Sequence, residues 1–174
     1  MRMRIALFGV LAAAGLSPCP TALAAEIPAQ TVTVTYDHPE RFTETREEKA
    51  LAPSRASNDY LATLKSYIEK RGAKMLPAGQ HLDVVITDVD RAGSFEPWRG
   101  PRLSEVRIIK DIYPPRINLN FKLLDAQGKV IREGTRTLRD LGFLTSDTAA
   151  ARDDSLRYEK RMIDRWLRNG PDKL

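Results

Sequence analysis

The order of the predicted elements places this chain in the α+β class, as a single domain with an antiparallel or mixed sheet of four to five strands. Three observations carry the prediction: an alternating strand opens the domain, a helix precedes a strand rich in branched residues, and a β-hairpin precedes a final helix. Adjacent strands with few crossover connections favour such a sheet, covered on one face by two helices.

The first half of the domain contains one strand, one connection and one helix. The segment TVTVTY, residues 31–36, alternates threonine with larger side chains, which predicts a half-buried strand. The charged segment 37–55 contains two prolines and is predicted to be a long connection. From Ser57 or Asn58 to Gly72, leucine and isoleucine recur at helical spacing, which predicts an amphipathic helix.

The second half of the domain is dominated by strands. The segment LDVVITDV, residues 82–89, is apolar on both faces and is predicted to lie inside the sheet. Residues 117–123 and 130–138 are predicted to pair as a β-hairpin, with Gly128 in a left-handed turn position. Residues 106–112, which precede two prolines, are a candidate for a further edge strand.

A final amphipathic helix is predicted over residues 156–167. It ends before the sequence Asn-Gly-Pro, a common way for a helix to stop. The row formed by Tyr158, Met162 and Trp166 has the spacing of a core contact.

The first 24 residues have the pattern of a cleaved secretory signal peptide. Two arginines are followed by an apolar run and then by small residues before Glu26, and the run is too short to span a bilayer. We therefore predict cleavage after Ala24 and a mature domain over residues 25–174, located in the periplasm or secreted. The competing interpretation is a lipidated Cys19, although Pro18 stands where such signals carry a small residue.

Cleavage has consequences for stability and for charge. It removes Cys19, the single cysteine, so the mature chain has no disulfide and must depend on its packed core. It also removes Arg2 and Arg4, which lowers the formal net charge from +5 to +3. Such a small surplus, with no basic helix or RNA-binding motif, argues against a nucleic-acid partner. No stable membrane span is expected, and the oligomeric state is left open.

Four strings of this sequence carry a family resemblance. The strings ITDVDRAGSFEPWRGP, VRIIKDIYPPRI, GKVIREGTRTLRDLGF and DSLRYEKRMIDRWL together resemble the secreted bacterial proteins grouped as domain of unknown function 3016. The resemblance covers roughly residues 32–167. It implies export in a bacterium, and it supplies no activity, cofactor or catalytic residue.

The stretch SFEPWRGP, residues 94–101, is the candidate binding segment. A tryptophan in such a broken segment either buries its large face or marks a recognition surface. The flanking prolines stiffen the backbone, while neighbouring arginines could stack on the ring or contact an anion. The candidate binding residues are Phe95, Glu96, Trp98, Arg99 and Arg102. The alternative is that Phe95 and Trp98 fold the loop onto the sheet as a hydrophobic plug.

Metal and catalytic candidates are few. Asp88, Asp90 and Gly93 match the opening of a calcium loop, but Arg99 occupies the closing position, where such loops have a glutamate. The two histidines, His38 and His81, are predicted to be ordinary loop residues. No cofactor is predicted.

Three functions are consistent with these observations. The first is a non-enzymatic binding or structural module of the bacterial envelope, which contacts a protein or a polymer through the loop around Trp98. The second is a small hydrolase that uses Glu96 with Asp88 or Asp90, which requires these carboxylates to converge in a cleft. The third is a calcium-stabilised domain, which requires a melting temperature that rises with calcium.

Overall fold

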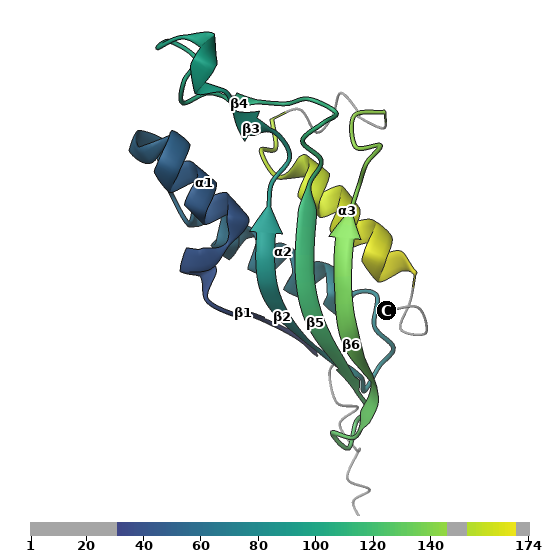
Figure 1. Ribbon diagram of the computed structural model, residues 1–174. Coiled ribbons are helices and arrows are strands. Elements are labelled where there is room, and N and C mark those ends of the chain that lie inside the picture. The colour runs from purple at the N-terminus through teal and green to yellow at the C-terminus, as the bar shows by residue number, and fades with distance from the viewer. Residues whose placement is uncertain (1–30, 146–152, 170–174) are drawn as a thin grey trace, which may run out of the picture.

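The computed structural model describes residues 31–145 and 153–169, which form a mixed four-stranded sheet and three α-helices (Figure 1). The predicted α+β class is therefore confirmed. The predicted signal peptide, residues 1–24, which includes Cys19, lies outside the described residues. The elements are β1 (Thr31–Tyr36), α1 (Thr43–Leu51), α2 (Asp59–Ala73), β2 (His81–Asp90), β3 (Ser94–Phe95), β4 (Arg107–Ile108), β5 (Arg116–Leu124), β6 (Val130–Arg139) and α3 (Arg157–Arg168), with short 3-10 turns at Pro39–Arg41, Pro53–Arg55 and Pro97–Arg99.

The sheet has the order β1-β2-β5-β6. Strand β1 runs parallel to β2, with Thr31 beside His81, whereas β2–β5 and β5–β6 are antiparallel. The sheet is therefore mixed. The parallel pairing places His38, just after β1, and His81, at the start of β2, at opposite ends of the sheet, so these two histidines cannot share a metal ion.

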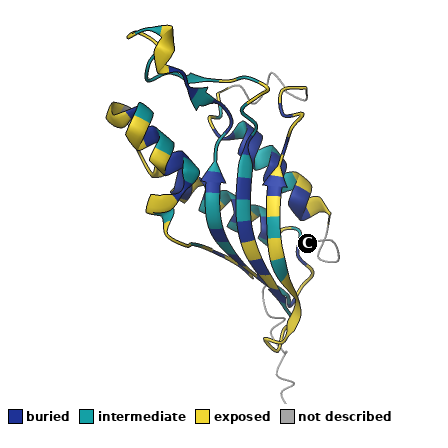
Figure 2. Ribbon diagram, viewed as in Figure 1, coloured by how far each residue is buried: buried dark blue, intermediate teal, exposed yellow. Residues whose placement is uncertain are grey.

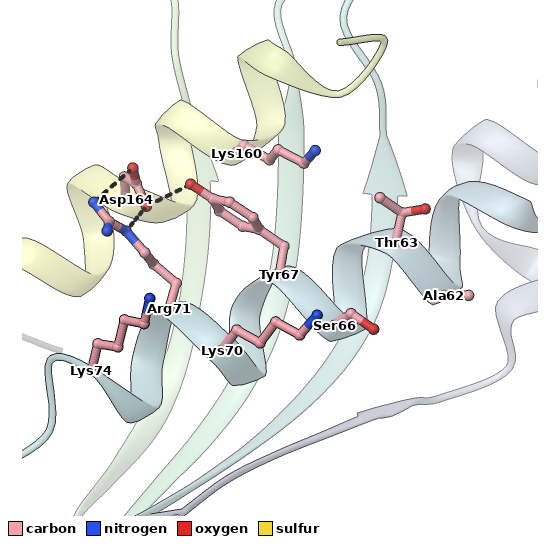
Figure 3. Close-up of a pocket in the computed structure, with 9 residues that line it drawn as sticks. All are labelled: Ala62, Thr63, Ser66, Tyr67, Lys70, Arg71, Lys74, Lys160 and Asp164. Carbon is pink, nitrogen blue, oxygen red and sulfur yellow. Dashed lines mark hydrogen bonds and ion pairs between the residues drawn. The ribbon is translucent and has the colours of Figure 1, made fainter.

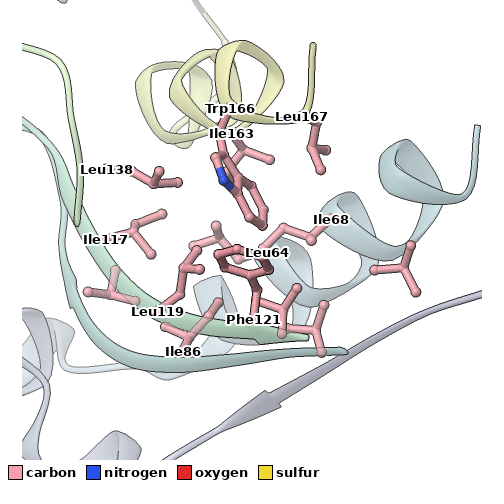
Figure 4. Packing of buried hydrophobic residues seen from close by; sticks show 14 of the residues in the cluster. Leu64, Ile68, Ile86, Ile117, Leu119, Phe121, Leu138, Ile163, Trp166 and Leu167 are labelled. Carbon is pink, nitrogen blue, oxygen red and sulfur yellow. The ribbon is translucent and has the colours of Figure 1, made fainter. Parts of the chain in front are cut away.

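Helices α2 and α3 cover one face of the sheet and form the main core with it (Figure 4). Leu64 and Ile68 of α2 and Ile163 and Trp166 of α3 are buried in one hydrophobic cluster with the inward-facing side chains of the sheet. The strands alternate, so their other side chains point to the uncovered face, where polar groups are exposed (Figure 2). The predicted arrangement of two helices on one face of the sheet is confirmed.

Several local predictions are also confirmed. The hairpin joins β5 to β6, and Gly128 in its turn has the left-handed φ of 78°. In α3, Tyr158, Met162 and Trp166 are all buried. These elements carry strong period-2 or period-3.6 patterns, because each buries an apolar face against the same core.

Two local predictions are wrong. The segment 37–55 is not a plain connection, because α1 lies within it. This helix buries Glu44, Thr45 and Glu48 rather than an apolar stripe, so it leaves no hydrophobic period in the sequence. The segment 106–112 contributes only Arg107–Ile108, and this short strand pairs with β3 instead of joining the main sheet.

The fold makes a testable prediction at Gly72, where α2 crosses β1. A Cβ atom at this position would lie 2.8 Å from Cγ2 of Val32, a branched side chain fixed in the strand. We expect Gly72→Ala to lower the free energy of unfolding by about 1–2 kcal/mol in urea denaturation, because overpacking outweighs the gain of about 1 kcal/mol in helix propensity. The matched control is Ala62→Gly, at an exposed position of α2, which isolates the propensity effect. A Gly72→Ala variant more stable than the parent would contradict this account of the contact.

Candidate functional site

The connection between β2 and β5, residues 91–115, extends beyond the end of the sheet and is here called the arm (Figure 1). Within it, β3 and β4 pair as a small antiparallel ribbon, with Ser94 opposite Ile108 and Phe95 opposite Arg107. The turn Pro97–Arg99 follows β3. All five candidate binding residues therefore lie on one projecting structure.

The two aromatic residues of the arm have different environments. Phe95 is 4% exposed, and its ring lies beneath the guanidinium of Arg107, with 4.6 Å from the guanidinium carbon to the ring centroid. Trp98 is 73% exposed. Phe95 is therefore buried within the arm, whereas Trp98 presents its ring to solvent.

Glu96 anchors the arm between these two aromatic residues. It is 1% exposed, accepts hydrogen bonds from Nζ of Lys110 at 2.5 Å and from the Tyr113 hydroxyl at 3.1 Å, and forms an ion pair with Arg99. The hydrogen bond from Lys110 contributes most to lowering the pKa of Glu96 to about 2. A carboxylate so firmly ionised, with its oxygens already bonded, is suited to holding the arm and not to donating a proton. Arg102 is exposed near the tip.

A group of buried charges fixes the base of the arm, and we call it the charge clamp: Glu44 and Glu48 of α1 with Arg91 and Arg107 of the arm. Glu44 is fully buried, accepts a hydrogen bond from the backbone N–H of Arg91 at 3.1 Å, and forms an ion pair with Arg107. Nη1 of Arg91 lies 3.7 Å from a carboxylate oxygen of each glutamate. The clamp joins α1 to the arm across more than forty residues of sequence.

Helix α3 holds the arm base from a second side. Glu159 is buried and accepts a hydrogen bond from the backbone N–H of Ala92 at 2.7 Å. Burial raises the pKa of Glu159, because the charged carboxylate loses its hydration. Burial also raises the pKa of Glu44, to about 8, against the opposing effect of Arg107 and Arg91.

A polar pocket of about 360 Å³ lies beneath the arm, where β2 ends and β5 begins. Arg116 forms ion pairs in this region with Asp88 at 3.3 Å and with Asp90 at 3.4 Å. The pocket is lined by Thr43, Glu47, Asp90, Arg91, Gly93, Ser94, Ile112, Tyr113, Pro114, Arg116 and Arg139. Glu96 is not among these residues, so the carboxylate that shares the pocket with Asp90 is Glu47 of α1.

The two candidate metal ligands are engaged in protein contacts. Asp88 accepts hydrogen bonds from the backbone N–H of Thr43 at 2.7 Å and from its hydroxyl at 2.9 Å, in addition to the ion pair with Arg116. Burial raises the pKa of Asp90, partly offset by Arg116. Within residues 31–145 and 153–169, no three His, Cys, Asp or Glu side chains are grouped so that they could hold a metal ion.

Residues of the charge clamp were missed by the sequence analysis. Glu44 and Glu48 lie in the segment that was predicted to be a connection, and Arg107 lies in the candidate edge strand, but no role was predicted for these residues or for Arg91. The available signal was the density of acidic residues in 43–51, which could have indicated a polar helix with buried partners. Their arginine partners could not be identified from spacing, because they lie far away in the sequence.

A second and larger hollow, of about 710 Å³, lies between α2 and α3 on the outer side of the helical layer (Figure 3). We call it the helix groove. Arg71 and the Tyr67 hydroxyl both donate hydrogen bonds to Asp164, at 2.9 Å each. The groove is lined by Ala62, Thr63, Ser66, Tyr67, Lys70, Arg71, Lys74, Lys160 and Asp164.

These observations define a small α+β protein that carries a projecting arm clamped by buried charges. The chain belongs to the family described as protein of unknown function (DUF3016), whose model matches residues 30–169. The family resemblance inferred from the four strings is thus confirmed. No helix in the described part of the chain combines the length and the apolar character needed to cross a bilayer.

Comparison with curated proteins gives no match. Among solved structures, the chain is similar to a variant of PelC from Paraburkholderia phytofirmans, solved as a dodecamer. The two are 11% identical, with 79% of this chain and 82% of that chain covered and a TM-score of 0.37. A likeness of this size carries no conclusion about the present chain.

The anchoring role of Glu96 predicts an acid-dependent loosening of the arm. Because the folded pKa lies below the usual 4.5, the stabilising contribution of Glu96 is present above about pH 4.5 and is lost as the pH falls toward about 2. With fluorotryptophan labelling, we expect the fluorine resonance of Trp98 to narrow as the pH falls through this range. In the Glu96→Gln variant, we expect the same resonance to be narrow already at pH 7. The Trp166 resonance serves as an internal control. Equal linewidths in Glu96→Gln, the parent and the exposed-site variant Glu133→Gln would refute the anchor.

Glu44 of the charge clamp predicts the opposite pH dependence of stability. Because the pKa of Glu44 is raised to about 8 from 4.5, the folded state binds more protons than the unfolded state between these values. The free energy of unfolding should therefore fall as the pH rises from about 5 to 8. In Glu44→Gln we expect this decrease to be smaller by roughly 1–3 kcal/mol, measured by urea denaturation at each pH. Parallel pH profiles for the variant and the parent would show that Glu44 does not titrate in this range.

Proposed function

We propose that the mature protein is a non-enzymatic binding module of the bacterial envelope, which docks onto a protein partner through Trp98. The observation that carries this proposal is the 73% exposure of Trp98 on an arm whose base is fixed by buried charges. The leader sequence supports a location in the periplasm or outside the cell.

The distribution of exposed apolar side chains supports a binding role for the arm. Of the eight large apolar residues that are exposed in the described part of the chain, four lie on the arm: Trp98, Leu103, Ile109 and Ile112. Apolar side chains gathered in one region of a surface commonly mark interaction sites. Tryptophan and arginine are among the residues that most often dominate protein–protein interfaces, and Arg99 and Arg102 follow this tryptophan in the chain.

Preorganisation of the arm favours tight binding. The backbone around Trp98 is restrained by Pro97 and Pro101, while Glu96 ties it to Lys110 and Tyr113. A segment already held in place loses less conformational entropy when it binds. The arginines beside the ring favour a partner with an apolar pocket and an acidic rim.

The alternative function, a hydrolase that pairs Glu96 with Asp88 or Asp90, has less support from the geometry. Glu96 is bonded to three neighbours and lies outside the pocket that Asp90 lines. A general acid needs a raised pKa and access to substrate, and the pKa of Glu96 is lowered.

The proposal predicts position-specific capture by the arm. A photo-crosslinking residue at position 98, introduced in the living bacterium, should capture one envelope protein that is not captured from position 165, an exposed site on α3. With that protein purified, we expect Trp98→Ala to weaken binding by about thirtyfold, as for a residue that dominates an interface.

The matched control is Ile131→Ala, which removes an exposed apolar side chain from β6, away from the arm. Because Trp98 is exposed, its removal should leave the melting temperature unchanged, so a loss of binding can be assigned to the contact. Unchanged affinity of Trp98→Ala, or the same captured protein from positions 98 and 165, would count against the proposal.

A further inference from the structure

The helix groove concentrates positive charge that the protein itself neutralises only in part, since Arg71 pairs with Asp164 and Lys160 with Asp154. Four of its lining residues are cationic, Lys70, Arg71, Lys74 and Lys160, against one carboxylate, Asp164. Lys70 and Lys74 are exposed and, within residues 31–145 and 153–169, form no ion pair with a carboxylate. They are spaced four residues apart, where like charges on a helix repel each other.

The electrostatics of α2 explain this charge only in part. Cations near the C-terminal end of a helix are stabilised by its dipole, which accounts for Lys70 and Arg71. It does not account for Lys160, which comes from α3 and extends into the same groove above the Tyr67 ring (Figure 3). Nζ of Lys160 lies 5.4 Å from the centre of that ring and 2.7 Å from Asp154.

The free donors of the groove determine the chemistry of a ligand. A planar carboxylate is best matched by the two-pronged guanidinium of arginine, but Arg71 already directs Nε and Nη2 to Asp164, at 2.9 and 3.4 Å. The Thr63 hydroxyl donates to the backbone carbonyl of Asp59 at 3.3 Å, so the remaining donors are the lysine ammonium groups and the hydroxyl of Ser66. Such point donors, approaching from several directions, suit a tetrahedral oxyanion such as phosphate.

We propose that the helix groove is a phosphate-binding site, in which Lys70 and Lys160 contact the anion from opposite helices and Ser66 supplies a hydroxyl donor. Its volume of about 710 Å³ exceeds the size of a phosphate ion and falls in the usual range for small-molecule sites. The natural ligand is therefore a phosphate ester, with the group attached to phosphorus lying along the Tyr67 side of the groove. The ester is either a soluble molecule or a lipid headgroup.

The test is a titration of the folded mature protein with inorganic phosphate at constant ionic strength, followed by amide chemical shifts. We expect saturable shifts confined to α2 and α3, with the dissociation constant raised about tenfold in Lys70→Gln and in Lys160→Gln. The matched control is Lys65→Gln, which removes the same charge from α2 at a position outside the groove. Absence of saturable shifts, or an equal effect of all three variants, would overturn the site, because general attraction to a positive surface requires no particular lysine.

Glucose 6-phosphate and phosphatidylcholine vesicles containing phosphatidylglycerol then distinguish the two sources of the ester. Competition by the sugar phosphate that depends on Lys70 identifies a soluble ligand, and Lys70-dependent sedimentation with the vesicles identifies a lipid headgroup. If neither probe binds in a way that depends on Lys70, the assignment to a phosphate ester is wrong.

Discussion

The position of α1 relative to the arm depends on the buried contact between Glu44 of α1 and two arginines of the arm, Arg91 and Arg107. Removing a carboxylate from water costs several kcal/mol, and the raised pKa of Glu44 shows that its partners offset only part of this loss. Here Glu44 receives a backbone N–H and the Arg107 guanidinium, with Arg91 nearby. Replacing a buried ion pair by apolar residues of similar volume is often neutral or even stabilising. What the charged contact adds is direction, because hydrogen bonds fix α1 and the arm in one mutual orientation.

Directional anchoring explains how so exposed a residue as Trp98 can be held in place. The ring gains no packing from the core, and the short ribbon of β3 and β4 has too few residue pairs to be stable alone. Three polar anchors take over that role: the clamp at the base, Glu159 on α3, and Glu96 below the tip. Phe95 adds a cation–π contact, since its ring is buried beneath the guanidinium of Arg107.

The same physics decides what the sequence could reveal. Strands β1, β2, β5 and β6 and helices α2 and α3 bury apolar faces, so their periodicity predicted both their type and their place in a two-layer domain. Helix α1 escaped prediction because its buried side chains are Glu44, Thr45 and Glu48. The sequence indicated SFEPWRGP as a candidate site, but Phe95 and Trp98 both carry large apolar rings, so only tertiary contacts could show which of them is buried. The helix groove was missed for a similar reason, because its lysines come from helices about ninety residues apart.

Helix α3 is the element that the arm and the helix groove have in common. Two consecutive residues of α3 belong to different regions: Glu159 accepts a hydrogen bond from the base of the arm, and Lys160 lines the helix groove. Two sites on one helix are not coupled merely because they are adjacent. Coupling requires that the helix can adopt a second position in which the affinity for each ligand differs from that in the first. The core opposes such a second position, because Ile163, Trp166 and Leu167 are buried between α2 and the sheet and packed interiors do not deform continuously (Figure 4). With α3 fixed in this way, ligand binding at one of the two proposed sites, the arm and the groove, is expected to leave the affinity of the other unchanged.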